Sequence, residues 1–309
     1  MKSHKNICYV TLLAVFILIA AVGIRADEST TYVSPKRGKD NEKCTQSSPC
    51  KTIVKAMGVT EVRGTIVLLD AGETADGKCS IIYDRVVNIS KSVTISASSE
   101  LIELKKKPCF IPYTNDHKDD RSIKVDGDKI VVTLRWLKFA EAGGNVGIVF
   151  SGGAKLRVDN CDFSGLNHGI VSTAAGELIV EKSTFNVSFA IWITDNAMPT
   201  SATISSSKFL GHTNLPHFPL SFGTNSTVLL EDSQVTASCP ISIVVNGAAT
   251  LKNVQINGSE TALVVQNDGS VKLTDVKITS GSESAIKING KGSAVLKNIS
   301  IEKLSDLKK

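Results

Sequence analysis

The stretch "KLRVDNCDF", residues 155–163, is followed at residues 177–185 by the similar stretch "ELIVEKSTF". Both have apolar residues at their second, fourth and last positions. Over the first five positions both stretches keep an apolar residue at the second and fourth positions, and this period of two predicts a strand with one buried face. The alternation breaks at the sixth position, Asn160 and Lys182, before the closing Phe163 and Phe185. We interpret the break as a corner between two short strands.

The same phrase recurs along the chain from residue 131 to residue 301. Aligned on their last residue, the copies end at Phe139, Phe163, Phe185, Phe209, Val235, Ile256, Ile278 and Ile301. The corner position, three residues before each end, is occupied by Trp136, Asn160, Lys182, Ser206, Asp232, Asn253, Asp275 and Asn298. Asn and Asp tolerate left-handed backbone and cap turns with their own side chains, which suits a corner.

After a loop, each copy but the last is followed by another short apolar strand, such as "VGIVF" or "HGIVS", and most of these strands end in a turn rich in Gly or Asn. Successive copies end 21 to 26 residues apart. A near-constant repeat of this length leaves no room for a helix and indicates that each unit wraps once around a common axis. The sequence therefore predicts an all-β fold, a right-handed parallel β-helix (solenoid) of about eight or more coils. Because only 5% of the residues are aromatic, we expect an aliphatic core.

The N-terminal part of the mature chain carries a second pattern. Cys44 and Cys50 bracket a tight loop, "PCKTIVKAM" follows, and then come "GTIVLLDAG" and "VVNISKSVTISA". This order resembles the start of pectin-lyase-like right-handed β-helix proteins. The resemblance implies a short amphipathic helix at about Thr52 to Met57 that caps the open end of the solenoid. Residues 27–309 would then form one domain, with the cap at about 32–60 and the coils at about 64–309.

The first 26 residues have the form of a secretory signal peptide. Lys2 and Lys5 precede an apolar run that extends to Ile24, and small Ala26 precedes Asp27. We expect a secreted, extracellular protein with no membrane span after cleavage, and a retained anchor is the alternative. Cleavage removes Lys2, Lys5 and Arg25, so the net charge of +5 is no argument for a nucleic-acid partner. Glycosylation sequons begin at Asn88, Asn186, Asn225, Asn257 and Asn298.

Six cysteines remain after such cleavage. In an oxidising compartment we expect Cys44 to pair with Cys50 and Cys79 with Cys109. Cys161 and Cys239 lie three coils apart in the predicted register, beyond the reach of a disulfide. We interpret both as unpaired, and Cys161 as a small core residue.

The outward-facing columns contain one candidate for chemistry. Arg135, Asp159 and Glu181 occupy the same position in successive copies, so adjacent coils bring them about 5 Å apart. Two carboxylates and an arginine at that spacing can act as acid and base or bind Ca²⁺. The alternative is a solvated charge ladder in which Arg135 pairs with Asp159. We expect no cofactor, and Ca²⁺ only if the chain is an enzyme.

Three other segments are interpreted as loops. Lys105, Lys106 and Lys107 form the densest basic patch, which we expect to be solvated, and a site for an anionic ligand is the alternative. The Asp-rich residues 113–130 lack the spacing of an EF-hand, and His212 and His217 in residues 210–222 have no metal-ligand partners nearby.

On function, the resemblance implies an architecture more than an activity, because the superfamily contains lyases, hydrolases, esterases, adhesins and bacterial surface passengers. The characteristic active-site phrases of pectate lyases, polygalacturonases and pectin methylesterases are absent from the sequence. The favoured hypothesis is a binding or surface-interaction module whose partners are extracellular polysaccharides or cell-surface glycans. The alternative is a divergent polysaccharide lyase or glycoside hydrolase that uses Arg135, Asp159 and Glu181.

Overall fold

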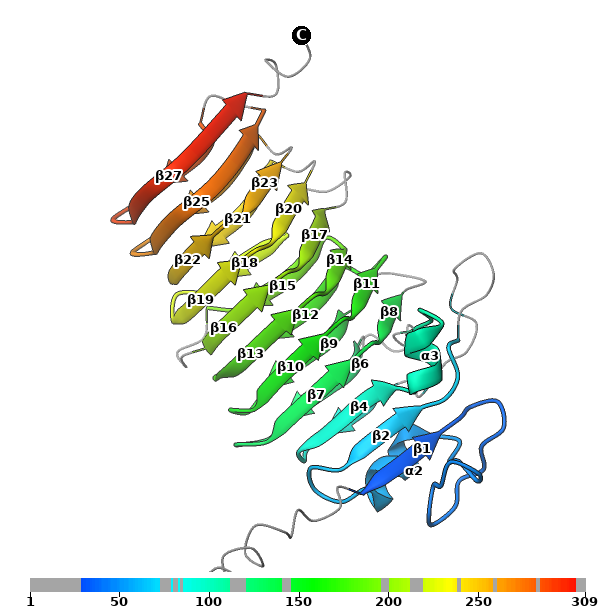
Figure 1. The fold of residues 1–309 in the computed structure, drawn as a ribbon. Helices are drawn as coiled ribbons and strands as arrows, with labels where there is room; N and C mark the ends of the chain where they lie inside the picture. The colour runs from blue at the N-terminus through cyan, green and yellow to red at the C-terminus, as the bar shows by residue number, and fades with distance from the viewer. Residues whose placement is uncertain are drawn as a thin grey trace, which may run out of the picture.

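The protein is a parallel β-solenoid in which successive coils stack into a rod (Figure 1). The computed structural model describes residues 29–72, 79, 83, 86–111, 121–140, 146–195, 200–211, 219–237, 240–257, 260–281 and 284–303. The predicted all-β parallel fold is confirmed. The segment 1–26, interpreted as a signal peptide, lies outside the described residues, as do Cys239, His212 and His217.

Each coil contributes strands to three faces. The first face consists of β1 (Thr30–Val33), β2 (Thr65–Leu68), β4 (Val93–Ala97), β7 (Val131–Arg135), β10 (Lys155–Asp159), β13 (Gly176–Glu181), β16 (Thr200–Ser205), β19 (Ser226–Glu231) and β22 (Ala248–Lys252). The second consists of β5 (Cys109–Phe110), β8 (Lys138–Ala140), β11 (Asp162–Ser164), β14 (Thr184–Asn186), β17 (Lys208–Gly211), β20 (Gln234–Ala237) and β23 (Gln255–Asn257). In the last two coils, β25 (Ser270–Ser280) and β27 (Ser293–Lys303) run through both of these faces.

The third face is a separate sheet, with nine strands among the described residues. It consists of β3 (Val87–Ile89), β6 (Arg121–Asp126), β9 (Val146–Ser151), β12 (His168–Ser172), β15 (Phe189–Ile193), β18 (Leu220–Phe222), β21 (Ile241–Val245), β24 (Thr261–Val265) and β26 (Ile286–Ile288). In the described part of the chain, seven coils, from β4–β6 to β22–β24, have a separate strand on every face. The expected count of eight or more is therefore matched only roughly. β1 pairs with β2, so the sheet begins before the boundary expected for the coils.

The register is the one that the sequence repeat predicts. Leu156 pairs with Leu178, and Phe163 pairs with Phe185. Backbone φ lies between 49° and 59° at every corner position, Trp136, Asn160, Lys182, Ser206, Asp232, Asn253, Asp275 and Asn298. The corner is thus imposed by the coil even where the residue is Trp or Lys, which have no intrinsic preference for left-handed backbone.

The core is not purely aliphatic, so the expectation from composition is wrong in one part of the rod. A ladder of stacked rings runs through Tyr83, Phe110, Phe139, Phe163, Phe185 and Phe209, with successive centroids 4.5–5.7 Å apart. Few aromatic residues are present, but the repeat places these six in one buried column. Beyond Phe209 the column continues with aliphatic Val235, Ile256 and Ile278, which are also buried.

A second buried column runs beside the corners and satisfies backbone groups there. The N–H of Cys161 donates to Ser183 Oγ, that of Ser183 to Ser207 Oγ, and that of Ser207 to Ser233 Oγ, over 3.1–3.2 Å. Each serine hydroxyl in turn donates to the carbonyl oxygen two residues before it. Serines are tolerated in this core because their hydroxyl groups complete the hydrogen bonds of the corner.

A short helix covers the N-terminal end of the rod, α2 (Ile53–Val59) (Figure 1). Its bounds differ slightly from the predicted Thr52 to Met57, because Thr52 is the N-cap and its hydroxyl accepts from the N–H of Lys55. Lys91 Nζ, from the coil above, donates to the carbonyl oxygens of Met57 and Thr60 at the other end of the helix. Ile53 and Ala56 are fully buried, so α2 closes the core.

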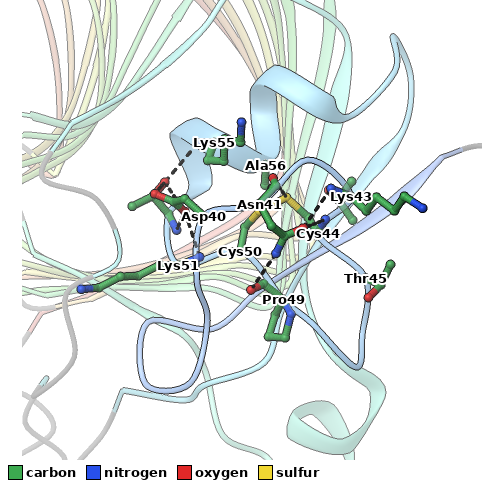
Figure 2. Close-up of a disulfide and its surroundings, with 12 residues drawn as sticks. Asp40, Asn41, Lys43, Cys44, Thr45, Pro49, Cys50, Lys51, Lys55 and Ala56 are labelled. Carbon is green, nitrogen blue, oxygen red and sulfur yellow. Dashed lines mark hydrogen bonds between the residues drawn. A yellow bond between two sulfur atoms is a disulfide. The ribbon is translucent and has the colours of Figure 1, made fainter.

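The loop before α2 is fixed by a disulfide and by two polar side chains (Figure 2). Asn41 Oδ1 accepts from the N–H groups of Lys43 and Cys44, and Asp40 Oδ1 accepts from those of Lys51 and Thr52. Among the described residues there are two disulfide bonds, Cys44–Cys50 and Cys79–Cys109, which are the pairs that the sequence favoured. Cys161 is buried and unpaired.

A second short helix, α3 (Ser99–Glu103), was not predicted. It follows β4, where later coils have a one-residue corner, and its N-cap Ser98 accepts from the N–H of Leu101. The insertion carries the three lysines expected to form a solvated loop. That expectation is wrong for Lys107, whose side chain is 15% exposed and forms an ion pair with Asp162. Neither helix in the described residues has the length and apolar character needed to cross a membrane.

Candidate functional site

The three residues singled out from the sequence lie side by side on the first face. Asp159 at the end of β10 pairs in register with Arg135 of β7 on one side and with Glu181 of β13 on the other. Parallel strands place such neighbours about 4.8 Å apart. The repeat thus brings together the residues that sequence reasoning proposed.

Both carboxylates have basic partners. Arg135 Nε lies 3.3 Å from Asp159 Oδ2, and Arg157 of β10 forms an ion pair with Glu181. Asp159 also accepts a hydrogen bond of 3.1 Å from Asn160 Nδ2, and its side chain is only 14% exposed. Sequence reasoning missed Arg157, although its place two residues before Asp159 on a strand puts it on the same outward face.

This charge ladder, which we define as Arg135, Lys155, Arg157, Asp159, Glu177 and Glu181, is balanced. Lys155 and Glu177 complete it with a contact of 2.8 Å between the same two strands, β10 and β13. Acid–base catalysis by a carboxyl pair usually needs one acid held protonated by apolar surroundings. Here both carboxylates already contact arginines, so the geometry favours a charge ladder between coils over an acid–base pair.

Ligands for a metal ion are not gathered in the described part of the chain. No group of three or more His, Cys, Asp or Glu side chains is placed to hold an ion there. In the Asp-rich segment 113–130, Asp116, Asp119 and Asp120 lie outside the described residues. Asp126 instead contacts Lys124 Nζ at 2.7 Å, and this hydrogen-bonded ammonium lowers the pKa of the Asp126 carboxyl.

Beyond the corner, at the start of the second face, the insertion that contains α3 contributes a cation, Lys107. Lys107 Nζ lies 2.8 Å from Asp162 Oδ2 and 5.0 Å from the centroid of the Trp136 ring. The Trp136 indole N–H donates to the carbonyl oxygen of Lys106 over 3.1 Å. These contacts fix the insertion against the coil and leave the Lys107 ammonium paired, which argues against an anion site at this lysine.

Further along the same corner, the charge ladder gives way to a shallow polar groove of about 270 Å³. We call it the corner groove; it is lined by Ser206, Ser207, Lys208, Asp232, Ser233, Gln234, Asn253 and Gln255. Gln234 and Gln255 pair in register on the second face, and Asn253 Nδ2 donates to Asp232 Oδ1 over 2.8 Å. Carboxylate, amide, hydroxyl and ammonium groups thus line one open surface that extends over adjacent coils.

A second polar hollow, of about 490 Å³, lies where the turns after the third face stack. This turn groove is lined by Thr224, Asn225, Ser226, Thr227, Asn246, Gly247, Ala248, Asn267, Asp268 and Ser270. It contains Asn225, the first residue of a glycosylation sequon. A glycan linked to Asn225 would stand in this groove, so the corner groove is the less encumbered of the two.

Three rings cluster on the outside of the third face. His168 stacks on Phe189 of the next coil with centroids 4.8 Å apart, and Trp192 lies 5.3 Å from His168. Trp192 is 39% exposed, whereas the other two are partly buried. The repeat predicts short apolar strands on this face, but sequence reasoning did not anticipate the cluster, because His168 meets the other two rings from a different coil.

The remaining predicted residues occupy surface or core positions. Among the sequon residues, Asn88, Asn186, Asn225 and Asn298 are exposed and Asn257 is partly buried, and their glycosylation stays a prediction. The Cys161 thiol is fully buried, and burial raises its pKa to about 12. A buried, neutral thiol is a poor nucleophile, so Cys161 is unsuited to covalent catalysis.

Comparisons with known proteins support the fold alone. No family model and no curated protein matches the sequence. The structure is similar to a rhamnogalacturonan lyase, with a TM-score of 0.54 and 10% identity over 82% of this chain and 75% of that one. It is also similar to the pectate lyase Pel9A, with a TM-score of 0.51 and 13% identity over 90% and 80% of the two chains.

A third similar structure is a GH136 lacto-N-biosidase from Eubacterium ramulus, with a TM-score of 0.51 and 8% identity. This match covers 89% of the present chain and 68% of the biosidase. Identities this low establish a common architecture, and function must be argued from the site itself.

Proposed function

We propose that this chain, which has the pectin-lyase-like β-helix fold, is a glycan-binding protein whose ligand lies along the corner groove. The observation that carries the proposal is the lining of that groove. Side chains of Lys208, Asp232, Gln234, Asn253 and Gln255 present both donors and acceptors to one open surface. Hydroxyl-rich ligands need this mixture, because each sugar hydroxyl both donates and accepts.

The solenoid also matches a polymer in its repeat. Equivalent side chains recur about every 4.8 Å along the rod, a spacing comparable with one sugar unit of an extended polysaccharide. Gln234 and Gln255 form such a repeat in adjacent coils. The structural neighbours named as enzymes of polysaccharides or oligosaccharides are consistent with a glycan ligand.

The test is a glycan-binding array, followed by titration of the strongest ligand into the wild type and two variants. Q234A/Q255A removes two amides from exposed or partly exposed positions on the groove, so we expect at least tenfold weaker binding without loss of folding. D268A, in the turn groove, is the matched control and should bind like the wild type. The proposal fails if no glycan binds or if the double variant retains full affinity.

The second candidate is a divergent polysaccharide lyase or glycoside hydrolase. The observation in its favour is the register contact between Asp159 and Glu181 beside Arg135. Assays on pectins, alginate and glycosaminoglycans, with and without Ca²⁺, distinguish the candidates. Turnover that disappears in Asp159→Asn supports the enzyme, and binding of a substrate without any turnover excludes it for that substrate.

We also propose that the protein is secreted after removal of residues 1–26. The proposal is supported by the form of this segment and by two disulfide bonds, which persist in oxidising compartments. Mass spectrometry of the protein recovered from culture medium should find an N-terminus at Asp27. An intact N-terminus in a membrane fraction would instead identify a retained anchor.

A further inference from the structure

The two ends of the described rod differ in how their interiors are covered. At the N-terminal end, α2 packs on the first coil, and Val33 of β1 is fully buried. At the other end, β27 pairs with β25 alone among the described strands. Leu296 and Ile301 of β27 are 52% and 55% exposed, whereas their counterparts in the previous coil, Leu273 and Ile278, are fully buried.

The exposed edge of β27 is long and apolar. It extends over 11 residues, and Ala294 and Ile299 lie partly buried on the same inward face as Leu296 and Ile301. An edge of this kind presents unpaired N–H and C=O groups to any strand that can reach it. Its inward side chains would gain burial from a further layer of apolar residues.

The four inward residues are arranged symmetrically about the corner. Ala294 and Leu296 precede it on the first face, and Ile299 and Ile301 follow it on the second. A two-fold axis through the corner, perpendicular to the rod, exchanges these two arms and keeps the interior on the same side. The rotation places Leu296 opposite Ile299 of the second copy, and Ala294 opposite Ile301 of the second copy.

We propose that two copies of the chain associate end to end, with their β27 strands paired antiparallel about this axis. Antiparallel pairing requires that opposed side chains lie on the same face of the sheet, and the register above fulfils this at all four inward positions. Head-to-tail stacking is disfavoured, because α2 covers the end that β27 would have to meet. The proposal is independent of any glycan ligand.

The size of the contact sets its expected strength. Eleven residues at about 3.3 Å each give an edge of about 36 Å. A contact along one strand edge of this length is small compared with a standard protein interface. We therefore expect a concentration-dependent dimer. The sequon residue Asn298 lies at the two-fold axis, where a linked glycan would block the contact, and its Nδ2 donates to Asp275 Oδ1. The experiment therefore uses S300A, which deletes the sequon and leaves Asn298 and its hydrogen bond in place.

Sedimentation velocity over a hundredfold range of concentration tests the pairing. S300A should shift from monomer to dimer, and L296E/I301E in that background should stay monomeric, because it places charges in the apolar interface. Both positions are already half exposed, so the variant should keep its circular-dichroism spectrum. V295E, in the same strand and background but on the outward face, is the matched control and should still dimerise.

Cross-linking tests the register independently. The outward residues Val295 and Ser300 oppose each other across the proposed axis, so V295C/S300C should form a covalent dimer under mild oxidation, identified by a peptide that joins the two positions. A monomer at every concentration would overturn the proposal. So would a dimer that survives L296E/I301E, because its interface would lie elsewhere.

Discussion

Phe163 and Phe185 stack face to face across one coil, with ring centroids 4.5 Å apart and an interplanar angle of 3°. The stack fits because Gly147 and Gly169, on the third face, leave room for the rings. A Cβ added at Gly169 would lie 2.6 Å from the Ala190 carbonyl oxygen and 2.8 Å from Phe185 Cδ1. The aromatic ladder and the glycines opposite it are therefore one packing unit.

Gly169→Ala should destabilise the protein by about 1–3 kcal/mol, because the added methyl group would overlap both the Ala190 carbonyl oxygen and the Phe185 ring in a packed core. Urea denaturation measures the change. Gly58→Ala is the contrasting control, because a Cβ there meets no atom within 4 Å and Gly58 lies inside α2. It should stabilise the protein by about 0.5–1 kcal/mol through helix propensity. Equal effects at both positions would contradict the packing unit.

Ser207→Ala should cost about 1–3 kcal/mol, because it leaves the buried N–H of Ser183 without its acceptor. The deletion removes one oxygen atom from a fully buried site, so the loss reports the hydrogen bond more than a cavity. Ser205→Ala, two residues away on the outward face, should change the free energy of unfolding by less than about 0.5 kcal/mol. Chemical denaturation of both variants tests the contrast.

Cys161 should resist alkylation in the folded protein. Its thiol is fully buried with a pKa raised to about 12, so thiolate is scarce at pH 8 and reagent has no access. Iodoacetamide treatment followed by peptide mass spectrometry should leave the Cys161 peptide unmodified before denaturation and modified after it. Rapid modification of the native protein would show that the corner column opens.

The Arg135–Asp159 contact should contribute little to stability. A double-mutant cycle with Arg135→Met and Asp159→Asn should give a coupling free energy of about 0.2–1 kcal/mol, because Arg135 is more than half exposed. The coupling should fall in about 1 M salt, where screening acts over roughly 3 Å. Coupling that is both larger and independent of salt would contradict a solvated ladder.

Asp126 should titrate below the usual range for aspartate, because Lys124 donates to its carboxylate and Ser151 and Arg121 add to the effect. Lys124→Met should raise the pKa of Asp126, which carbon-detected NMR measures directly. The folded-state pKa lies below the unfolded one, so the stabilisation is present above the unfolded pKa. It is lost as the pH falls through the folded pKa. An unchanged Asp126 titration in the variant would rule out this contact.

As with the fold, the sequence predicted those parts of the candidate site that follow from the repeat. Asp159, Glu181 and Arg135 were placed together from spacing alone, because one repeat equals one coil. Their chemistry was not predictable in this way, because it depends on Arg157, which enters through a diagonal contact between strands. The His168–Phe189–Trp192 cluster and the insertion of Lys107 beside Trp136 also join segments that no local pattern relates.

The sequence by itself determined the coil. Alternating apolar positions, a recurrent corner and a near-constant interval are enough to specify strand, face and register, because identical units stack only on identical units. Only the tertiary structure decided which side chains contact one another across coils. Phenylalanines that are distant in the sequence stack in a ladder, and the carboxylates pair with arginines. The serines are buried as hydrogen-bond partners and the inward face of β27 is exposed, because these outcomes depend on side chains from different coils.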